Sequence, residues 1–204
     1  MTIYQRLSGL AFAAVSGSIL ALTAPATQAQ NRMPIKPIEY QSPSKPVETG
    51  KAPGLQSRLL SDVNGTKTYV LIFAKGDEVL SGLTDFANQN KVQSAHFSAI
   101  GAFQRATTAW FDPAKKQYRL NPIEGPVELV SLLGDIAVHD GKPTVHAHMA
   151  VGHPDGRVEG GHLINAYVFP TVELFMTVYL TPLYKKDDAE TDLNFIDPAQ
   201  KSKP

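Results

Sequence analysis

The chain has 204 residues, of which 43% are hydrophobic, and this suits one folded domain with extensions. Its 19 basic and 19 acidic side chains give a formal net charge of zero, which disfavours a nucleic-acid-binding protein, because such proteins usually carry a basic patch or stripe. The absence of cysteine excludes disulfides, thiolate catalysis and cysteine-ligated metal sites.

The first 29 residues have the pattern of an export signal. A single charged residue, Arg6, precedes an apolar run rich in small side chains, and the segment ATQAQ offers a cleavage site after Ala29. The alternative is a membrane anchor, but Ser, Gly and Thr interrupt the apolar run and Pro25 follows it. We therefore expect residues 1–29 to be a signal peptide. The mature protein, with 18 basic and 19 acidic residues, is then periplasmic or secreted and has no stable membrane anchor.

Three segments are expected to follow the signal. Residues 30–54 are rich in proline and polar side chains, so they are expected to form a flexible or extended arm, because proline blocks helices and central strands. Residues 55–184 are expected to form the folded domain. Residues 185–204 are a charged tail that either packs on the domain or stays loose. The tail has few large apolar side chains: Leu193, Phe195 and Ile196.

Within the domain the pattern predicts many strands and one helix. The segment Lys67–Ala74 is dense in β-branched and aromatic residues and predicts a strand. Apolar residues then recur at helical spacing from Val79 to Ala87, with acidic residues before them and Asn90 after them. The other predicted features are strands at 92–103 and 170–182, a hairpin turning at Asp112-Pro113, and two strands joined by the turn HDGKP at 139–143. The fold class is therefore α+β, a single domain with an antiparallel-dominated mixed sheet or partial barrel and one main helix.

Four of the six histidines lie between residues 143 and 164. His146 and His148 are two apart on a predicted strand, so they share one face, with Cα atoms roughly 6–7 Å apart. His162 follows a glycine pair in a turn-rich segment that could return the chain over that face. Three histidines with an open position form a catalytic-type metal site, although a polar strand face has the same spacing. The remaining histidines are expected to be structural or solvated: His96, His139 and His153.

Glu173 is the candidate catalytic residue. It lies within an apolar strand, where a carboxylate is costly to bury unless it is paired. Two alternatives remain open: Glu173 faces solvent, or it pairs with a cation such as Arg105 or Arg157. From the loop before His162, Glu159 could reach the same pocket and Arg157 could bind an anionic substrate, although an exposed loop arginine fits the sequence better.

The stretch 132–176 resembles the signature half of the PPC domain, a family found in plants and prokaryotes. The strand-turn-strand GDIA…DGKPTVHAH, the loop DGRVEGGHL and the strand PTVELF correspond in order, and the resemblance covers about Thr68 to Tyr179. It implies an α+β fold and a homotrimer. In prokaryotic members it also implies a metal cluster at the positions of His146, His148 and His162.

The resemblance also offers alternative functions. Plant members bind DNA and couple the domain to an AT-hook with an Arg-Gly-Arg-Pro core, which this sequence lacks, so we expect no nucleic-acid binding. The histidine pattern also resembles acetolactate decarboxylase, whose related fold holds a zinc that polarises a substrate carbonyl. We expect an exported protein that binds a divalent metal, zinc in the first place, and a small-molecule ligand. The alternatives are a metal-dependent lyase or hydrolase of a small oxo-acid and, by family label, a DNA-binding module.

Overall fold

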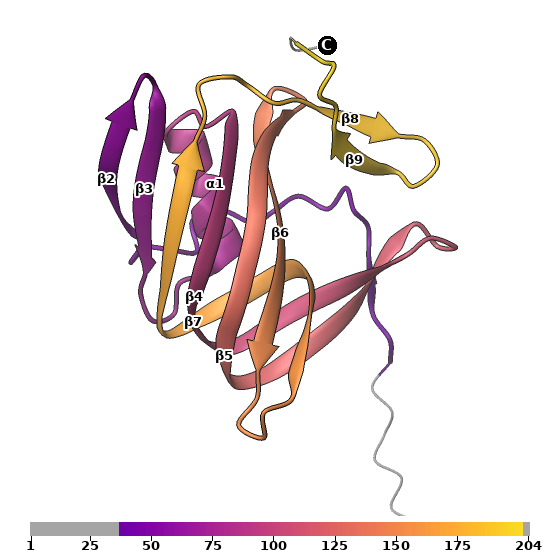
Figure 1. Ribbon diagram of the computed structural model, residues 1–204. Coiled ribbons are helices and arrows are strands. Elements are labelled where there is room, and N and C mark those ends of the chain that lie inside the picture. The colour runs from indigo at the N-terminus through magenta and orange to yellow at the C-terminus, as the bar shows by residue number, and fades with distance from the viewer. Residues whose placement is uncertain (1–36, 202–204) are drawn as a thin grey trace, which may run out of the picture. The chain divides into compact units, whose positions relative to one another are not determined.

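Three long antiparallel strands dominate the structure, a computed structural model that describes residues 37–201 (Figure 1). They are β4 (Ser94–Asp112), β5 (Gln117–His139) and β7 (Val158–Val178). The other elements are β1 (Tyr40–Gln41), β2 (Gln56–Val63), β3 (Thr66–Phe73), α1 (Val79–Gln89), β6 (Lys142–Gly152), β8 (Lys185–Asp188) and β9 (Leu193–Ile196). The predicted signal peptide 1–29 and the first residues of the arm lie outside the described residues.

The main sheet curls into a partial barrel. Its strand order is β1-β5-β4-β7-β3-β2, and β6 pairs with both β5 and β7, which partly closes the sheet. The register of β4 against its neighbours shifts near Gly101 and again between Phe103 and Arg105, and such irregularities bend strands. A Cβ atom on Gly101 would lie 2.4 Å from the carbonyl oxygen of Thr171, so only glycine fits at this bend. The predicted α+β class, with an antiparallel-dominated sheet, one helix and a single domain, is confirmed.

The helix α1 covers the inner face of the sheet and packs against β6 and β7. The carboxylate of Glu78 caps its first turn by accepting hydrogen bonds from the backbone N–H groups of Leu80 and Ser81. Glu78 also accepts a hydrogen bond from the N–H of Ala166 in β7, which ties the start of the helix to the sheet. The helix buries a stripe of side chains: Val79, Leu83, Phe86 and Ala87. The predicted helix and its ends, including Asn90 as the C-cap, are therefore confirmed.

Two features of the sheet differ from the sequence prediction. The strand β2 was not predicted, although Asn64 and Gly65, both at positive φ, form the two-residue turn that joins it to β3. The strand β7 runs unbroken from residue 158, so Gly160 and Gly161 belong to a strand rather than to a glycine-rich loop. The sequence suggested a loop because glycine is uncommon in strands.

Both ends of the described chain pack on the domain. In the predicted arm, β1 pairs with β5, and the N–H of Gly54 donates to the carboxylate of Asp77. In the predicted charged tail, β8 and β9 form a hairpin of their own. The N–H of Val138 in β5 donates to the carbonyl of Leu183, just before this hairpin, at 2.8 Å. Within residues 37–201, no helix has the length and apolar character needed to cross a bilayer.

Candidate metal centre

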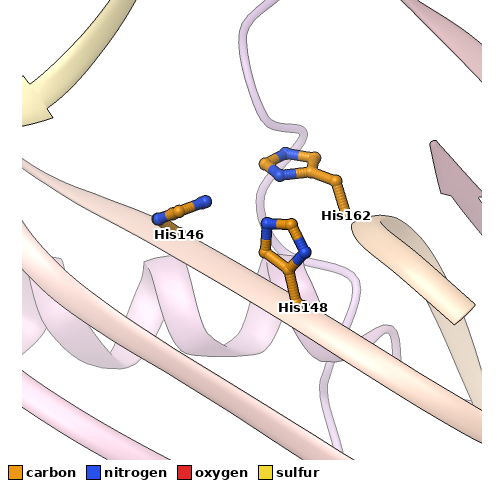
Figure 2. Close-up of side chains that lie close together, drawn as sticks. All are labelled: His146, His148 and His162. Carbon is orange, nitrogen blue, oxygen red and sulfur yellow. The ribbon is translucent and has the colours of Figure 1, made fainter. Parts of the chain in front are cut away.

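Two neighbouring strands bring three histidines together. His146 and His148 belong to β6, and His148 lies directly opposite His162 of β7 in the sheet register. Side chains alternate along a strand, so Ala147 and Met149 are buried in the core, and the histidines stand on the opposite face. We call this face, turned away from α1, the outer face of the sheet. Figure 2 shows the three imidazole rings gathered around a common point.

The geometry of the three rings suits a single ion. The centroids of the His146 and His148 rings are 5.2 Å apart, and each lies 5.3 Å from the centroid of His162. One ring nitrogen from each residue can be chosen so that all three lie within 4.8 Å of one another. Nitrogens bound tetrahedrally to one zinc lie about 3.3 Å apart, given a Zn–N bond of about 2.0–2.1 Å. Small side-chain rotations would bring the rings to that distance.

The two glycines before His162 allow the close strand packing that the site needs. A Cβ atom on Gly160 would lie 2.2 Å from the carbonyl oxygen of Met149 in β6. A Cβ atom on Gly161 would lie 2.7 Å from the carbonyl oxygen of Ala109 in β4. The prediction that these glycines permit a tight backbone before His162 is confirmed. The prediction that His162 lies in a turn is wrong, because it lies within β7.

Two of the three histidines, His148 and His162, are in surroundings that favour the neutral form that binds metals. The pKa of His162 is lowered to about 3, mainly by burial and to a smaller extent by the nearby His146, His148 and Lys185. Burial also lowers the pKa of His148, with a smaller contribution from His146. A neutral imidazole has one nitrogen with a free lone pair, which is the ligand atom for a divalent ion. At neutral pH the site therefore presents lone pairs without first losing protons from these two rings.

Three further residues surround the histidines, and the sequence analysis missed all of them. The ring of Tyr118 in β5 stacks on His162, with centroids 4.4 Å apart and an interplanar angle of 12°. Oδ2 of Asp135 lies 3.3 Å from Nδ1 of His146, and Nζ of Lys185 lies 3.9 Å from Oδ1 of Asp135. Counting back from the predicted HDGKP turn places Asp135 opposite His146, so the sequence held a signal for this pair. No sequence signal marked Tyr118 or Lys185.

The structure does not bring the predicted catalytic residue to the histidines of its own chain. Glu173 is exposed on β7, where it lies between Ile72 of β3 and Ile100 of β4. It therefore occupies the solvent-facing position that the sequence left open as an alternative. The apolar pattern of this segment was misleading because Phe175, the next residue on the same face, is also exposed.

The other residues named from the loop contact one another instead of the histidine cluster. Nε2 of His153 contacts the carboxylate of Glu159, and the guanidinium of Arg157 lies 3.5 Å from the same carboxylate. The His153 side chain is only 12% exposed, so it is a packed residue rather than a solvated one. The remaining two histidines also have partners outside the cluster: His96 contacts the Tyr179 hydroxyl, and His139 contacts Asp187.

The chain matches the model of a known protein family. Residues 60–179 match the family model described as the Plants and Prokaryotes Conserved (PCC) domain. Nothing among the curated proteins is significantly similar to the chain.

Three solved structures of other proteins match this chain over most of their own length. A "plant- and prokaryote-conserved (PPC) protein" of Pyrococcus horikoshii is 28% identical with a TM-score of 0.61, over 76% of this chain and 99% of that one. A "metal-containing protein" of Archaeoglobus fulgidus is 32% identical with a TM-score of 0.59, over 64% and 92%. A "putative DNA-binding protein" of Ralstonia eutropha JMP134 is 32% identical with a TM-score of 0.60, over 63% and 90%.

Proposed function

Because this chain belongs to the Plants and Prokaryotes Conserved domain family and gathers three histidines at one point, we propose that it binds one divalent metal ion per subunit. The ligands are His146, His148 and His162. The observation that carries the proposal is their arrangement, with one nitrogen of each ring within 4.8 Å of the others. The depressed pKa of His162 supports it, because a ring that resists protonation is available to a metal.

Zinc is the ion that we propose for this site. Imidazole ligands suit zinc, copper, iron and nickel, and three protein ligands with an open position are typical of catalytic zinc sites. The similarity to a "metal-containing protein" of Archaeoglobus fulgidus supports metal binding in general, without naming the ion.

The open position of the metal is where a small-molecule ligand would bind. A metal with such a position can polarise a carbonyl oxygen or lower the pKa of bound water, as lyases and hydrolases require. Such an enzyme also needs a group that moves protons near the bound substrate. Glu173, the residue suggested for this role by the sequence, is exposed and separate from the cluster. We therefore propose a metal- and ligand-binding protein, with a lyase or hydrolase of a small oxo-acid as the alternative.

The homotrimer that the family resemblance implies needs a contact surface, and the outer face of the sheet offers one. Phe175, Ser98, Leu133 and His148 lie side by side on β7, β4, β5 and β6, so the histidine site continues into a row with apolar side chains. Phe175, Leu133 and the nearby Ile100 are all more than half exposed. An exposed apolar surface of this kind is typical of protein–protein contacts. We propose that neighbouring subunits cover it.

We also propose that the protein is exported and that it does not bind DNA. The signal-like segment 1–29 supports a periplasmic or secreted protein. The balanced charge and the absence of an AT-hook argue against DNA as a partner, even though a similar protein of Ralstonia eutropha is called "putative DNA-binding". A protein that leaves the cytoplasm also has no access to the chromosome.

Substituting single histidines tests the proposed ligand set. We would measure bound metal per chain by mass spectrometry, and folding by circular dichroism, for the mature protein and its variants. His148→Ala and His162→Ala should each lose most of the metal and keep the sheet, because the core lies on the other face of the strands. His153→Ala is the matched control, since His153 pairs with Glu159, and it should keep its metal. Loss of metal from His153→Ala but not from His162→Ala would show that the ligand set is wrong.

A further inference from the structure

The C-terminal hairpin β8–β9 lies outside the segment that matches the family model, which ends at residue 179. It nevertheless reaches the immediate surroundings of the histidine cluster. Its first residue, Lys185, has a side chain that is only 4% exposed, which is unusual for lysine. A buried ammonium group beside a candidate metal centre requires a structural explanation, because it carries the same sign of charge as the ion.

The first link between the hairpin and the cluster is Asp135. Its Oδ2 lies 3.3 Å from Nδ1 of His146, from the strand position directly opposite in β5. A carboxylate that accepts the N–H of one ring nitrogen fixes the ring's tautomer and leaves the other nitrogen for a metal. Asp135 thus stands where an orienting partner of a metal-bound histidine is expected.

The second link is Lys185 itself. Its Nζ lies 3.9 Å from Oδ1 of Asp135, so the two carboxylate oxygens of Asp135 face Lys185 and His146. Among residues 37–201, Oδ1 of Asp135 is a buried side-chain oxygen with no hydrogen-bond partner. A carboxylate in this setting is costly without a compensating charge, and Lys185 supplies that charge.

The hairpin is anchored at positions far apart on the sheet. At the end of β5, Nε2 of His139 lies 2.8 Å from Oδ1 of Asp187 in β8. At the other end of β5, the ammonium of Lys116 donates to the carbonyl of Ala189 at 3.1 Å and to the carboxylate of Asp192 at 3.2 Å. The strand that carries Lys185 is therefore fixed relative to Asp135, and Lys185 reaches it as part of a docked element.

We propose that the β8–β9 hairpin is a functional part of the metal centre, in which Lys185 is a positioning residue. Lys185 fixes the carboxylate of Asp135, and Asp135 fixes the ring of His146 for metal binding. This inference rests on the proposed function, since it assumes that the three histidines bind a metal. The β8–β9 hairpin would then contribute to the metal centre although it lies outside residues 60–179, which the family model matches.

The direction in which metal affinity changes when Lys185 is replaced distinguishes a positioning role from a simple charge effect. A lysine near a bound cation repels it, so if Lys185 acted through its charge alone, removing it would tighten metal binding. If Lys185 acts through Asp135 and His146, removing it weakens binding, because the ring loses its orientation. Losses of roughly 10–100-fold are typical when such orienting partners are removed.

The test is the zinc Kd of the mature protein and five variants, measured by competition with a chromophoric chelator. Lys185→Met and Asp135→Asn should each weaken binding roughly 10–100-fold, and the double variant should be no weaker than either one, because both act through the same ring. Lys185→Arg should stay close to wild type. Lys186→Met is the matched control on the same strand, because Lys186 is exposed, and it should change nothing.

The visible spectrum of the cobalt(II)-loaded protein provides a second measurement, because it reports the ligand geometry at the metal. Lys185→Met should alter this spectrum, and Lys186→Met should not. If wild-type protein binds metal and Lys185→Met binds it equally well or more tightly, the positioning role is wrong while the metal site stands. The same holds if Lys185→Arg loses as much affinity as Lys185→Met. If the wild type binds no metal, the proposed function itself fails.

Discussion

Lowering the pH from 7 to 5 should destabilise the metal-free protein through His162. Its pKa is about 3 in the folded chain and 6.5 in the unfolded chain, because burial disfavours the charged ring. Between these values the unfolded chain binds a proton that the folded chain does not. The contribution of the neutral His162 ring to the free energy of unfolding is therefore fully present above the unfolded pKa of 6.5. It is lost progressively as the pH falls below that value.

The size of this loss follows from the unfolded pKa alone, because pH 5 lies above the folded pKa. At 1.36 kcal/mol per pKa unit, the difference between 6.5 and 5 costs the folded state about 2 kcal/mol. The lowered pKa of His148 acts in the same direction. For a domain that is marginally stable, as most are, a loss of this size is readily measured.

Urea unfolding at fixed protein concentration, in the presence of a chelator, measures the effect. The free energy of unfolding of wild type should fall between pH 7 and pH 5 by about 2 kcal/mol more than that of His162→Gln, which has no ring to protonate. An identical pH dependence in wild type and His162→Gln would refute the reasoning, because it would mean that His162 titrates normally in the folded chain.

Four further predictions concern the fold, the assembly, the partners and the location. Gly160→Ala should lower the melting temperature and the metal content together, because its Cβ would lie 2.2 Å from a carbonyl oxygen of β6; unchanged values for both would contradict the packing argument. Light scattering on the mature protein should give three times the subunit mass, and a monomer at micromolar concentration would exclude the trimer. Fluorescence anisotropy at physiological salt should show weak, salt-sensitive DNA binding or none; sub-micromolar, sequence-dependent binding would overturn this expectation. N-terminal sequencing of protein from a bacterial periplasmic fraction should begin near Gln30, and an intact Met1 in the cytoplasm would rule out export.

The part of the site that could be predicted from the sequence depends on local periodicity. Residues two apart on a strand share a face, so the pairing of His146 with His148 follows once the strand is recognised. The turn at Asp140-Gly141 fixes the register of β5 against β6, and it places Asp135 opposite His146. The ends of α1 were predictable for the same reason, since Glu78 and Asn90 act on the backbone of their own helix.

The remainder depends on contacts between distant parts of the chain. Tyr118 of β5 stacks on His162 of β7, and no local pattern predicts a contact between residues so far apart in the sequence. Lys185 stands in a charged segment, and only the docking of β8 on the end of β5 makes it a buried residue. For Glu173 the sequence left burial and solvent exposure open, because its neighbours are apolar; the structure places it on the outer face, where Phe175 is exposed as well.

The metal content of the wild-type protein tests the central claim most directly. The mature protein would be equilibrated with an excess of zinc, nickel, manganese or iron, separated from unbound ions, and analysed by mass spectrometry. The three-histidine site predicts one ion per chain, with zinc retained best, and a release of the ion in acid as His146, His148 and His162 become protonated. Protein that is folded and holds none of these ions would show that the three histidines form only a polar strand face.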